Sequence, residues 1–371
     1  MISAQEQSHQ TEAETVVETP VYTDIAEYTT DGGLLDEIEV HGSKWLIVTY
    51  TDQLETWKKV WKKRCATGEG KNQSILAELR TEEDILLREG AISQTPSLTQ
   101  IYDTTVLVSN LNGPMNSGID RANGILYSPC SQEIIAINIE SGKEINRITL
   151  PLFNDLHSVS FNQKTETMMV VSSGADKVIE IDRSGKIIWK WDATNYADEL
   201  GLINEETKQR RTKLVDVKDY REWVVPTPAQ TTHINTATWL DESHIGVTLF
   251  HQGIALVVNK ETNTTQIVAT ELVKPHGFQP TEDGKFIVTS TGQGKVLVLD
   301  HEFKIIEEIT GFFDGHPADE ISWIHTTFPI GEKLVALDQT LAEMVIFDLK
   351  SKRIQRIKHP HGWKVAFIDR V

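Results

Sequence analysis

Short β-rich segments recur at a nearly constant interval between residue 113 and the C-terminus. Most copies open with a histidine in front of an alternating strand, at His157, His233, His276, His325 and His361. An apolar strand ending in Asp or Asn follows 23 to 26 residues later, at Asp182, Asn259, Asp300 and Asp348. A turn rich in Gly, Ser, Asn and Lys then leads to a last strand. Each unit therefore predicts a four-stranded antiparallel meander, which is the blade of a β-propeller.

Five full units fit this pattern, at 113–150, 155–192, 230–270, 274–310 and 320–358. A sixth unit opens near His361, and the chain ends after roughly one strand of it. Propellers commonly complete such a blade with strands from the other chain end, because closure of the ring removes exposed sheet edges. We expect the missing strands at 104–109 and at 44–50. The predicted fold is an all-β, six-bladed propeller with an N-terminal helical extension; five and seven blades are the alternatives.

Three further segments lie outside the repeat. Residues 1–40 are expected to be extended or disordered, and residues 41–103 are expected to supply an N-terminal strand and a helical cover. The helices are predicted over 53–91, since apolar residues recur there at helical spacing. Within the propeller, which we place at 104–371, residues 193–229 interrupt the repeat. This insertion joins an outer strand to the next inner strand, so it is a candidate lid over the channel.

Composition excludes several classes of function. The net charge of −18 argues against general binding to nucleic acid or to anionic membranes. Cys65 and Cys130 are too few for a disulfide framework and show no CxxC spacing. The N-terminal residues carry no basic or apolar signal region, and no apolar stretch has the length of a membrane span. The sequence predicts a cytoplasmic protein and leaves its oligomeric state open.

The repeated histidines are the strongest chemical signal. In a propeller the first strand of each blade lines the central channel, so residues that open these strands form a ring around the axis. Neutral imidazoles arranged in this way can bind a divalent transition metal and leave a position open for water or substrate. Iron or zinc is favoured, with copper or manganese as alternatives. The predicted ligands are His157, His233, His276, His325 and His361.

Neighbouring residues complete the predicted site. Asp155, Asp319 and Glu320 lie close in sequence to the ring and are candidates for orienting the imidazoles. Phe278, Trp323 and Trp363 either shape an apolar pocket or pack in the core. The alternative interpretation of the histidine column is structural, in which each imidazole bonds to neighbouring strands and channel water. We favour a metal-dependent enzyme that acts on a small organic molecule.

Two family resemblances add to this prediction. The segment Lys186-Ile187-Ile188-Trp189-Lys190-Trp191, followed by Thr232-His233-Ile234-Asn235, resembles the arylsulfotransferase-type propellers. The resemblance implies sulfuryl transfer through a channel histidine without a metal; His233 matches the motif histidine and His276 is the implied catalytic residue.

The second resemblance is to NHL-type propellers. It rests on Pro275-His276-Gly277-Phe278 and on the segment Asp283-Gly284-Lys285-Phe286-Ile287-Val288. Within that group, the peptidyl-hydroxyglycine lyases hold zinc with channel histidines. The carotenoid oxygenases, a separate propeller family, hold iron with four histidines. Three alternatives therefore stay open: a metal-dependent enzyme, a sulfotransferase-like enzyme that uses His276, and a noncatalytic binding propeller.

Overall fold

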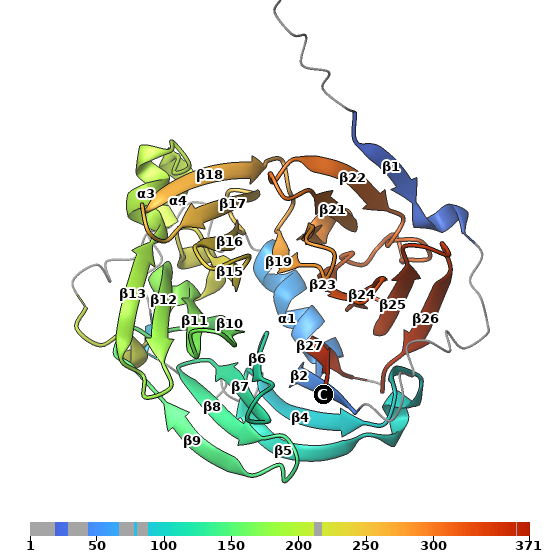
Figure 1. The fold of residues 1–371 in the computed structure, drawn as a ribbon, viewed down its shortest axis with the longest axis horizontal. Helices are drawn as coiled ribbons and strands as arrows, with labels where there is room; N and C mark the ends of the chain where they lie inside the picture. Colours follow the sequence, from blue (N-terminus) through green and yellow to red (C-terminus); the bar gives the residue numbers. More distant parts are fainter. Residues whose placement is uncertain (1–18, 29–43, 67–77, 80–87, 211–216, 361) are drawn as a thin grey trace, which may run out of the picture.

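The protein is a six-bladed β-propeller in the computed structural model, which describes residues 19–28, 44–66, 78–79, 88–210, 217–360 and 362–371. Six sheets surround a central axis, as the view in Figure 1 shows. The predicted fold class and number of blades are confirmed. In the described part of the chain, no helix has both the length and the apolar character of a membrane span. The cytoplasmic location stays a prediction.

The first three blades follow the chain in order, each running from an inner to an outer strand. Blade 1 consists of β6 (Gly118–Asp120), β7 (Ile125–Cys130), β8 (Glu133–Asn138) and β9 (Glu144–Ile148). Blade 2 consists of β10 (Leu156–Asn162), β11 (Thr167–Ser172), β12 (Lys177–Asp182) and β13 (Ile187–Asp192). Blade 3 consists of β15 (Ile234–Trp239), β16 (His244–Leu249), β17 (Ile254–Asn259) and β18 (Thr264–Ala269).

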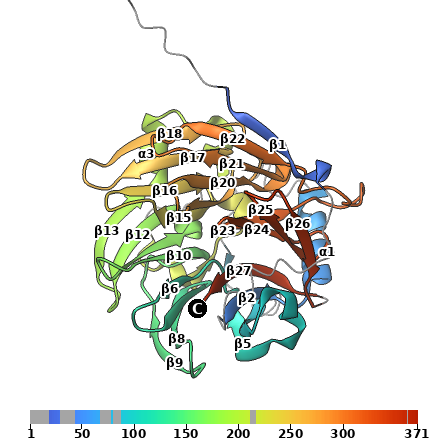
Figure 2. The same cartoon turned by 45° about the vertical axis from the view of Figure 1, so that its right-hand side comes forward.

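The next two blades repeat the same antiparallel order. Blade 4 consists of β19 (His276–Pro280), β20 (Phe286–Ser290), β21 (Lys295–Leu299) and β22 (Ile305–Thr310). Blade 5 consists of β23 (Ile324–Ile330), β24 (Lys333–Asp338), β25 (Glu343–Asp348) and β26 (Ile354–Lys358). The N-terminal strand β1 (Val21–Asp24) pairs in parallel with β22 and extends blade 4 at the rim (Figure 2).

Blade 6 closes the ring with strands from both parts of the chain. It consists of β27 (Lys364–Arg370), β2 (Trp45–Thr51), β4 (Glu89–Thr95) and β5 (Thr105–Asn112). The predicted contributions of 44–50 and 104–109 are therefore present. The prediction of helices over 53–91 is partly wrong, because β4 occupies the end of that stretch. The section 80–87 lies outside the described residues.

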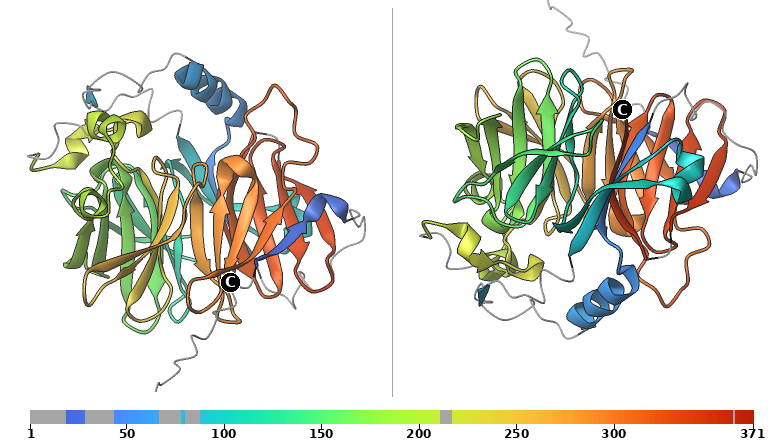
Figure 3. Two further views of the ribbon diagram at one scale, coloured as in Figure 1. Left: turned by 90° about the horizontal axis from the view of Figure 1, so that it is seen from above. Right: turned by 90° about the horizontal axis from the view of Figure 1, so that it is seen from below.

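Packing between the blades forms the core. The middle strands β11, β20, β24 and β25 are buried along their whole length, and β16 is buried after its first residue, so their apolar side chains contact the sheets on both sides. Helix α1 (Leu54–Ala66) follows β2 and crosses over the centre of the ring. Helices α3 (Ala193–Glu199) and α4 (Glu205–Arg210) stand on the same face of the disc as α1 (Figure 3).

The insertion between blades 2 and 3 also holds short elements. Strand β14 (Trp223–Val224) pairs with β3 (Glu78–Leu79). The short 3-10 helices η5 (Tyr220–Glu222) and η6 (Thr227–Ala229) lie before and after β14 in the chain. The insertion contributes Thr227 to the central cavity described below. Its role as a lid stays a prediction.

Candidate functional site

Four of the five predicted histidines line one cavity on the α1 side of the ring. The cavity has a volume of about 90 Å³. Each blade contributes one residue from the region where its inner strand opens: Met115, His157, His233, His276, His325 and Lys364. We call this space the histidine cavity. His361, the fifth predicted ligand, lies outside the described residues.

Irregularities at the start of the inner strands aim these side chains at the cavity. The pairing register shifts between Leu156 and Ser158 and again between Ile324 and Thr327. His157 and His325 therefore sit in the bulges themselves. A β-bulge places an unpaired residue in the strand and changes the direction of its side chain. The repeated histidines thus coincide with irregular strand pairing at the start of the inner strands.

His233 is positioned by a different device, a capped loop in front of β15. Its φ angle is 45°, which is left-handed and costs free energy for a residue other than glycine. The carboxylate of Asp176 accepts hydrogen bonds from the backbone N–H groups of Thr231 at 3.0 Å, Thr232 at 2.7 Å and His233 at 3.1 Å. These bonds fix the strained loop and so hold the imidazole at the cavity wall.

Hydrogen bonds to the Nδ1 atoms define the tautomers of three histidines. His157 Nδ1 donates to the carbonyl oxygen of Asp155 at 3.1 Å. His276 Nδ1 lies 2.9 Å from the carbonyl oxygen of Lys274 and 2.8 Å from Thr291 Oγ1. Because a carbonyl oxygen only accepts, the proton of each neutral ring is on Nδ1. The Nε2 atom of both rings therefore keeps its lone pair.

His233 reaches the same state through a side-chain relay. The amide nitrogen of Gln230 donates to Asp155 Oδ2 at 2.8 Å and to the carbonyl oxygen of Val225 at 2.7 Å. The amide oxygen of Gln230 must then face His233 Nδ1, with which it is hydrogen-bonded. His233 is thus protonated on Nδ1, and its Nε2 atom is available as a ligand or a base.

Asp155 connects the two neighbouring imidazoles. Its backbone carbonyl orients His157, and its carboxylate orients His233 through Gln230. Arg88 Nη1 contacts the same carboxylate at 2.7 Å. Burial opposes ionisation of Asp155, but Arg88 and the nearby histidines outweigh it and hold the pKa of Asp155 below its usual range. The predicted orienting role of Asp155 matches these contacts.

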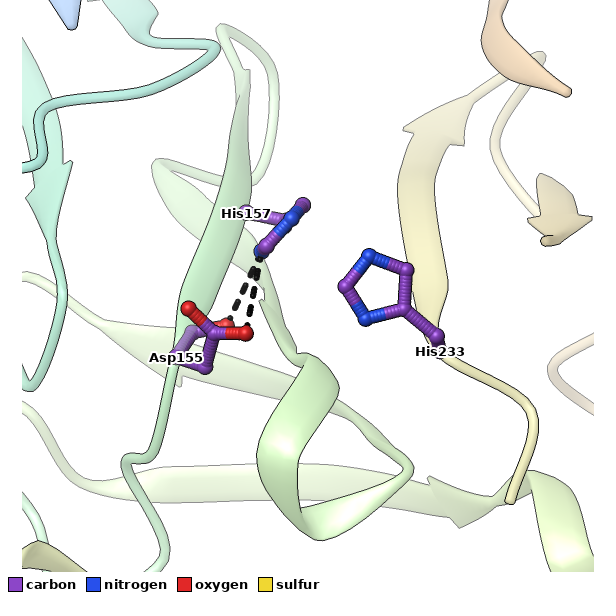
Figure 4. A group of neighbouring side chains, drawn as sticks. All are labelled: Asp155, His157 and His233. Carbon is purple, nitrogen blue, oxygen red and sulfur yellow. Dashed lines mark hydrogen bonds and ion pairs between the residues drawn. The ribbon is translucent and has the colours of Figure 1, made fainter. Parts of the chain in front are cut away.

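Asp155, His157 and His233 also form a group with metal-binding potential. Their ligand atoms all lie within 4.8 Å of one another, and this is the one such group of His, Cys, Asp and Glu found in the described part of the chain. Figure 4 shows the two imidazoles, from neighbouring blades, above the Asp155 carboxylate. The carboxylate lies on the Nδ1 side of His157, 4.0 Å from that atom, and the Nε2 atoms are the ring nitrogens left without a proton.

Burial keeps the cavity histidines neutral. It lowers the pKa of His276 to about 3 and lowers the pKa values of His233 and His325 well below the usual value. The pKa of His157 is also lowered by burial, although Asp155 partly opposes the shift. Neutral imidazole is the form that binds metals and accepts protons.

The histidines form two pairs and not one continuous ring. The ring centroids of His157 and His233 are 4.6 Å apart, and those of His276 and His325 are 4.8 Å apart. Phe250 lies between the pairs, 4.9 Å from His233 and 5.9 Å from His276. The second pair therefore lies beside the first, on the next two blades of the same cavity.

The wall opposite His233 carries a lysine that the histidine pattern did not indicate. Lys364 opens β27, and its ammonium lies 3.5 Å from the ring centroid of Trp57 and 4.3 Å from that of Tyr50. Burial lowers the pKa of Lys364 well below its usual value, and the charge of Arg88 adds to this effect. A lone charged residue at the start of the apolar run Val365-Ala366-Phe367 was the available signal in the sequence.

The other nominated residues have structural contacts. Lys58 Nζ lies 3.2 Å from Glu320 Oε2, and Lys62 Nζ donates to the carbonyl oxygen of Asp319 at 3.2 Å, so this loop fixes α1. Phe278 is fully buried between blades, and Trp363 packs against the core of blade 6. Trp323 lines the histidine cavity and lies 5.7 Å from His276.

Comparison with known proteins identifies the fold. No family model matches the chain, and no curated protein matches its sequence. The propeller of a nidogen/laminin complex covers 88% of this chain and 98% of its own at 11% identity, with a TM-score of 0.58. A protein of unknown function from Bacteroides caccae covers 89% of this chain and 99% of its own at 10% identity, with a TM-score of 0.53. A streptogramin B lyase covers 78% and 84% at 11% identity, with a TM-score of 0.49.

These likenesses define the class of protein as a six-bladed β-propeller. At identities of 10 to 11%, they establish the fold alone. They do not identify the arylsulfotransferase family or the NHL family specifically. Function must therefore be argued from the histidine cavity itself.

Proposed function

We propose that the protein is a metal-dependent enzyme that acts on a small organic molecule in the histidine cavity. The observation that carries the proposal is the shared state of His157 and His233. Both rings are protonated on Nδ1 by partners that Asp155 organises, so both present Nε2 lone pairs. Outer hydrogen bonds of this kind are typical of metal-binding histidines.

The donor set fits a divalent transition metal. Two imidazole Nε2 atoms suit iron or zinc and leave positions open for water and substrate. The Asp155 carboxylate lies on the Nδ1 side of the rings, 4.0 Å from His157 Nδ1, and accepts hydrogen bonds from Arg88 and Gln230, so it would orient the two ligands. When bound, the metal would supply Lewis acidity or activate oxygen.

The rest of the cavity would serve the substrate. His276 and His325 are neutral and line the same cavity beside the first histidine pair, so they can hydrogen-bond a bound molecule. Phe250, Trp323 and Trp57 supply apolar walls that exclude water from the reacting groups. This arrangement of a few polar groups among aromatic walls is typical of a site for a small molecule.

Metal analysis of the purified protein tests the proposal. Wild-type protein loaded with Fe(II) or Zn(II) and then desalted is expected to retain about one equivalent of metal per chain. His157→Ala and His233→Ala should lose it, because each removes one nitrogen ligand. His244→Ala is the matched control: this histidine pairs with Asp241 on the surface of blade 3. Retention of metal by His233→Ala, or no retention by wild type, would contradict the proposal.

Sulfuryl transfer through His276 is the second candidate, and the same tautomer argument favours it. With Nδ1–H held by Lys274 and Thr291, the Nε2 lone pair of His276 is free to attack sulfur. The S–N bond would form as the bond between sulfur and the aryl oxygen breaks, releasing a phenolate. The oxygen of an acceptor hydroxyl would then attack sulfur as the S–N bond breaks, and the hydroxyl proton would pass to the phenolate or to water. Ping-pong kinetics with phenyl sulfate, lost in His276→Ala and independent of metal, are the expected signature. A protein without metal and without this activity would be a binding propeller.

A further inference from the structure

Lys364 is held in an aromatic cleft at the edge of the histidine cavity. Tyr50 comes from the end of β2, beside Lys364 in the sheet, and Trp57 comes from the first turns of α1. The lysine is 5% exposed, and its ammonium lies against both ring faces. Helix α1 therefore contributes one wall of the cavity, in addition to covering the ring.

The ammonium has no acidic partner close by. Among the residues that the structure describes, no carboxylate lies within 4.0 Å of Lys364 Nζ. Arg88, the other cation on the cavity wall, is paired with Asp155. Burial without a counter-ion disfavours the charged form of this amine, and aromatic faces offset that cost only in part. An anion that enters the cavity would supply the missing negative charge.

We propose that the histidine cavity binds a small organic anion, an aryl carboxylate or an aryl sulfate ester, and that Lys364 binds its charged group. This inference rests on the proposed function, because it names the substrate class of the same cavity. Tyr50, Trp57, Phe250 and Trp323 would enclose the apolar body of the ligand. Such a ligand matches both the charge and the aromatic lining of the walls.

The order of the blades sets the orientation of the ligand. Lys364 is in blade 6 and His233 is in blade 3, so they lie on opposite walls of a six-membered ring. An anion held by Lys364 directs the far end of the molecule toward His157 and His233. Binding energy at the charged end would thus position the reacting end at the proposed metal ligands.

Calorimetric titration with benzoate, phenyl sulfate and uncharged benzamide tests the inference. Wild-type protein should bind at least one anion more tightly than benzamide. Lys364→Met should weaken anion binding by about tenfold or more and leave benzamide binding unchanged. Lys364→Arg should retain the preference for the anion, since it keeps the charge. Tighter binding of benzoate would identify the charged group of the ligand as a carboxylate, and tighter binding of phenyl sulfate would identify it as a sulfate ester.

Controls separate this inference from the metal proposal. Lys295→Met removes a half-buried lysine that pairs with Glu308 far from the cavity, and it should bind the anions as wild type does. Metal content should be normal in Lys364→Met. His233→Ala should lose metal but keep its preference for the anion over benzamide. Equal binding of benzoate, phenyl sulfate and benzamide, unaltered anion binding by Lys364→Met, or no binding of either anion would overturn the inference.

Discussion

Replacing Asp176 with alanine should strongly destabilise the entrance to blade 3. The carboxylate accepts four hydrogen bonds: from the backbone N–H groups of Thr231, Thr232 and His233, and from the Thr232 hydroxyl at 2.6 Å. All of these residues are buried, and His233 is in the left-handed region. The substitution therefore leaves four buried donors without their acceptor.

The size of the effect follows from these bonds. A buried donor that loses a charged partner costs about 1–3 kcal/mol, and relaxation of the loop and entry of water reduce the sum. We expect Asp176→Ala to lower the free energy of unfolding by about 3–5 kcal/mol. Urea denaturation followed by tryptophan fluorescence measures this value.

A matched control tests the reasoning. Asp182 accepts similar hydrogen bonds from Ser184 and Lys186, but in an exposed turn where water can replace it. Asp182→Ala should therefore lower the free energy of unfolding far less than Asp176→Ala does. If Asp176→Ala costs less than about 1 kcal/mol, or no more than Asp182→Ala, the account of the His233 loop is wrong.

Two further outcomes follow from the geometry. The pKa of His276 is about 3 in the native protein and about 6.5 in the unfolded chain, so the unfolded chain binds more protons between these pH values. The free energy of unfolding should therefore fall as the solution is acidified through this window. His276→Gln should make that slope shallower by up to about 1.4 kcal/mol per pH unit. Identical acid slopes would contradict this. A Cβ atom at Gly90 would overlap the carbonyl oxygens of Thr49 and Tyr50, so Gly90→Ala should lower the free energy of unfolding by about 2 kcal/mol or more. A Cβ atom at Gly124 meets open space, so Gly124→Ala should lower it by about 1 kcal/mol. Urea denaturation measures both values. Equal costs would refute the packing argument.

The sequence predicted the blades because their signals are local. Alternating strands, turn residues and the interval from His233 to Asn259 are all visible without knowledge of distant contacts. Strand β4 was missed because Glu89–Thr95 follows a helical pattern and has a glycine as its second residue, Gly90, which weakens the strand signal. Its place in blade 6 depends on pairing with β2 and β5, which the local sequence does not encode.

The site was predicted only as a set of residues. The histidine repeat placed His157, His233, His276 and His325 on one cavity. It did not indicate the division into two pairs, since this depends on where Phe250 lies between neighbouring blades. The contacts of Gln230 with Asp155 and of Lys364 with Trp57 join residues far apart in the chain, so they too required the structure.

Anomalous diffraction from crystals soaked with zinc or iron tests the central claim most directly. Data recorded on both sides of the absorption edge of the metal should show one strong peak between the Nε2 atoms of His157 and His233. The peak should disappear in His233→Ala crystals and persist in His244→Ala crystals. A wild-type map without a peak at these two side chains, or with the metal bound elsewhere, would contradict the assignment of this cavity as a metal centre.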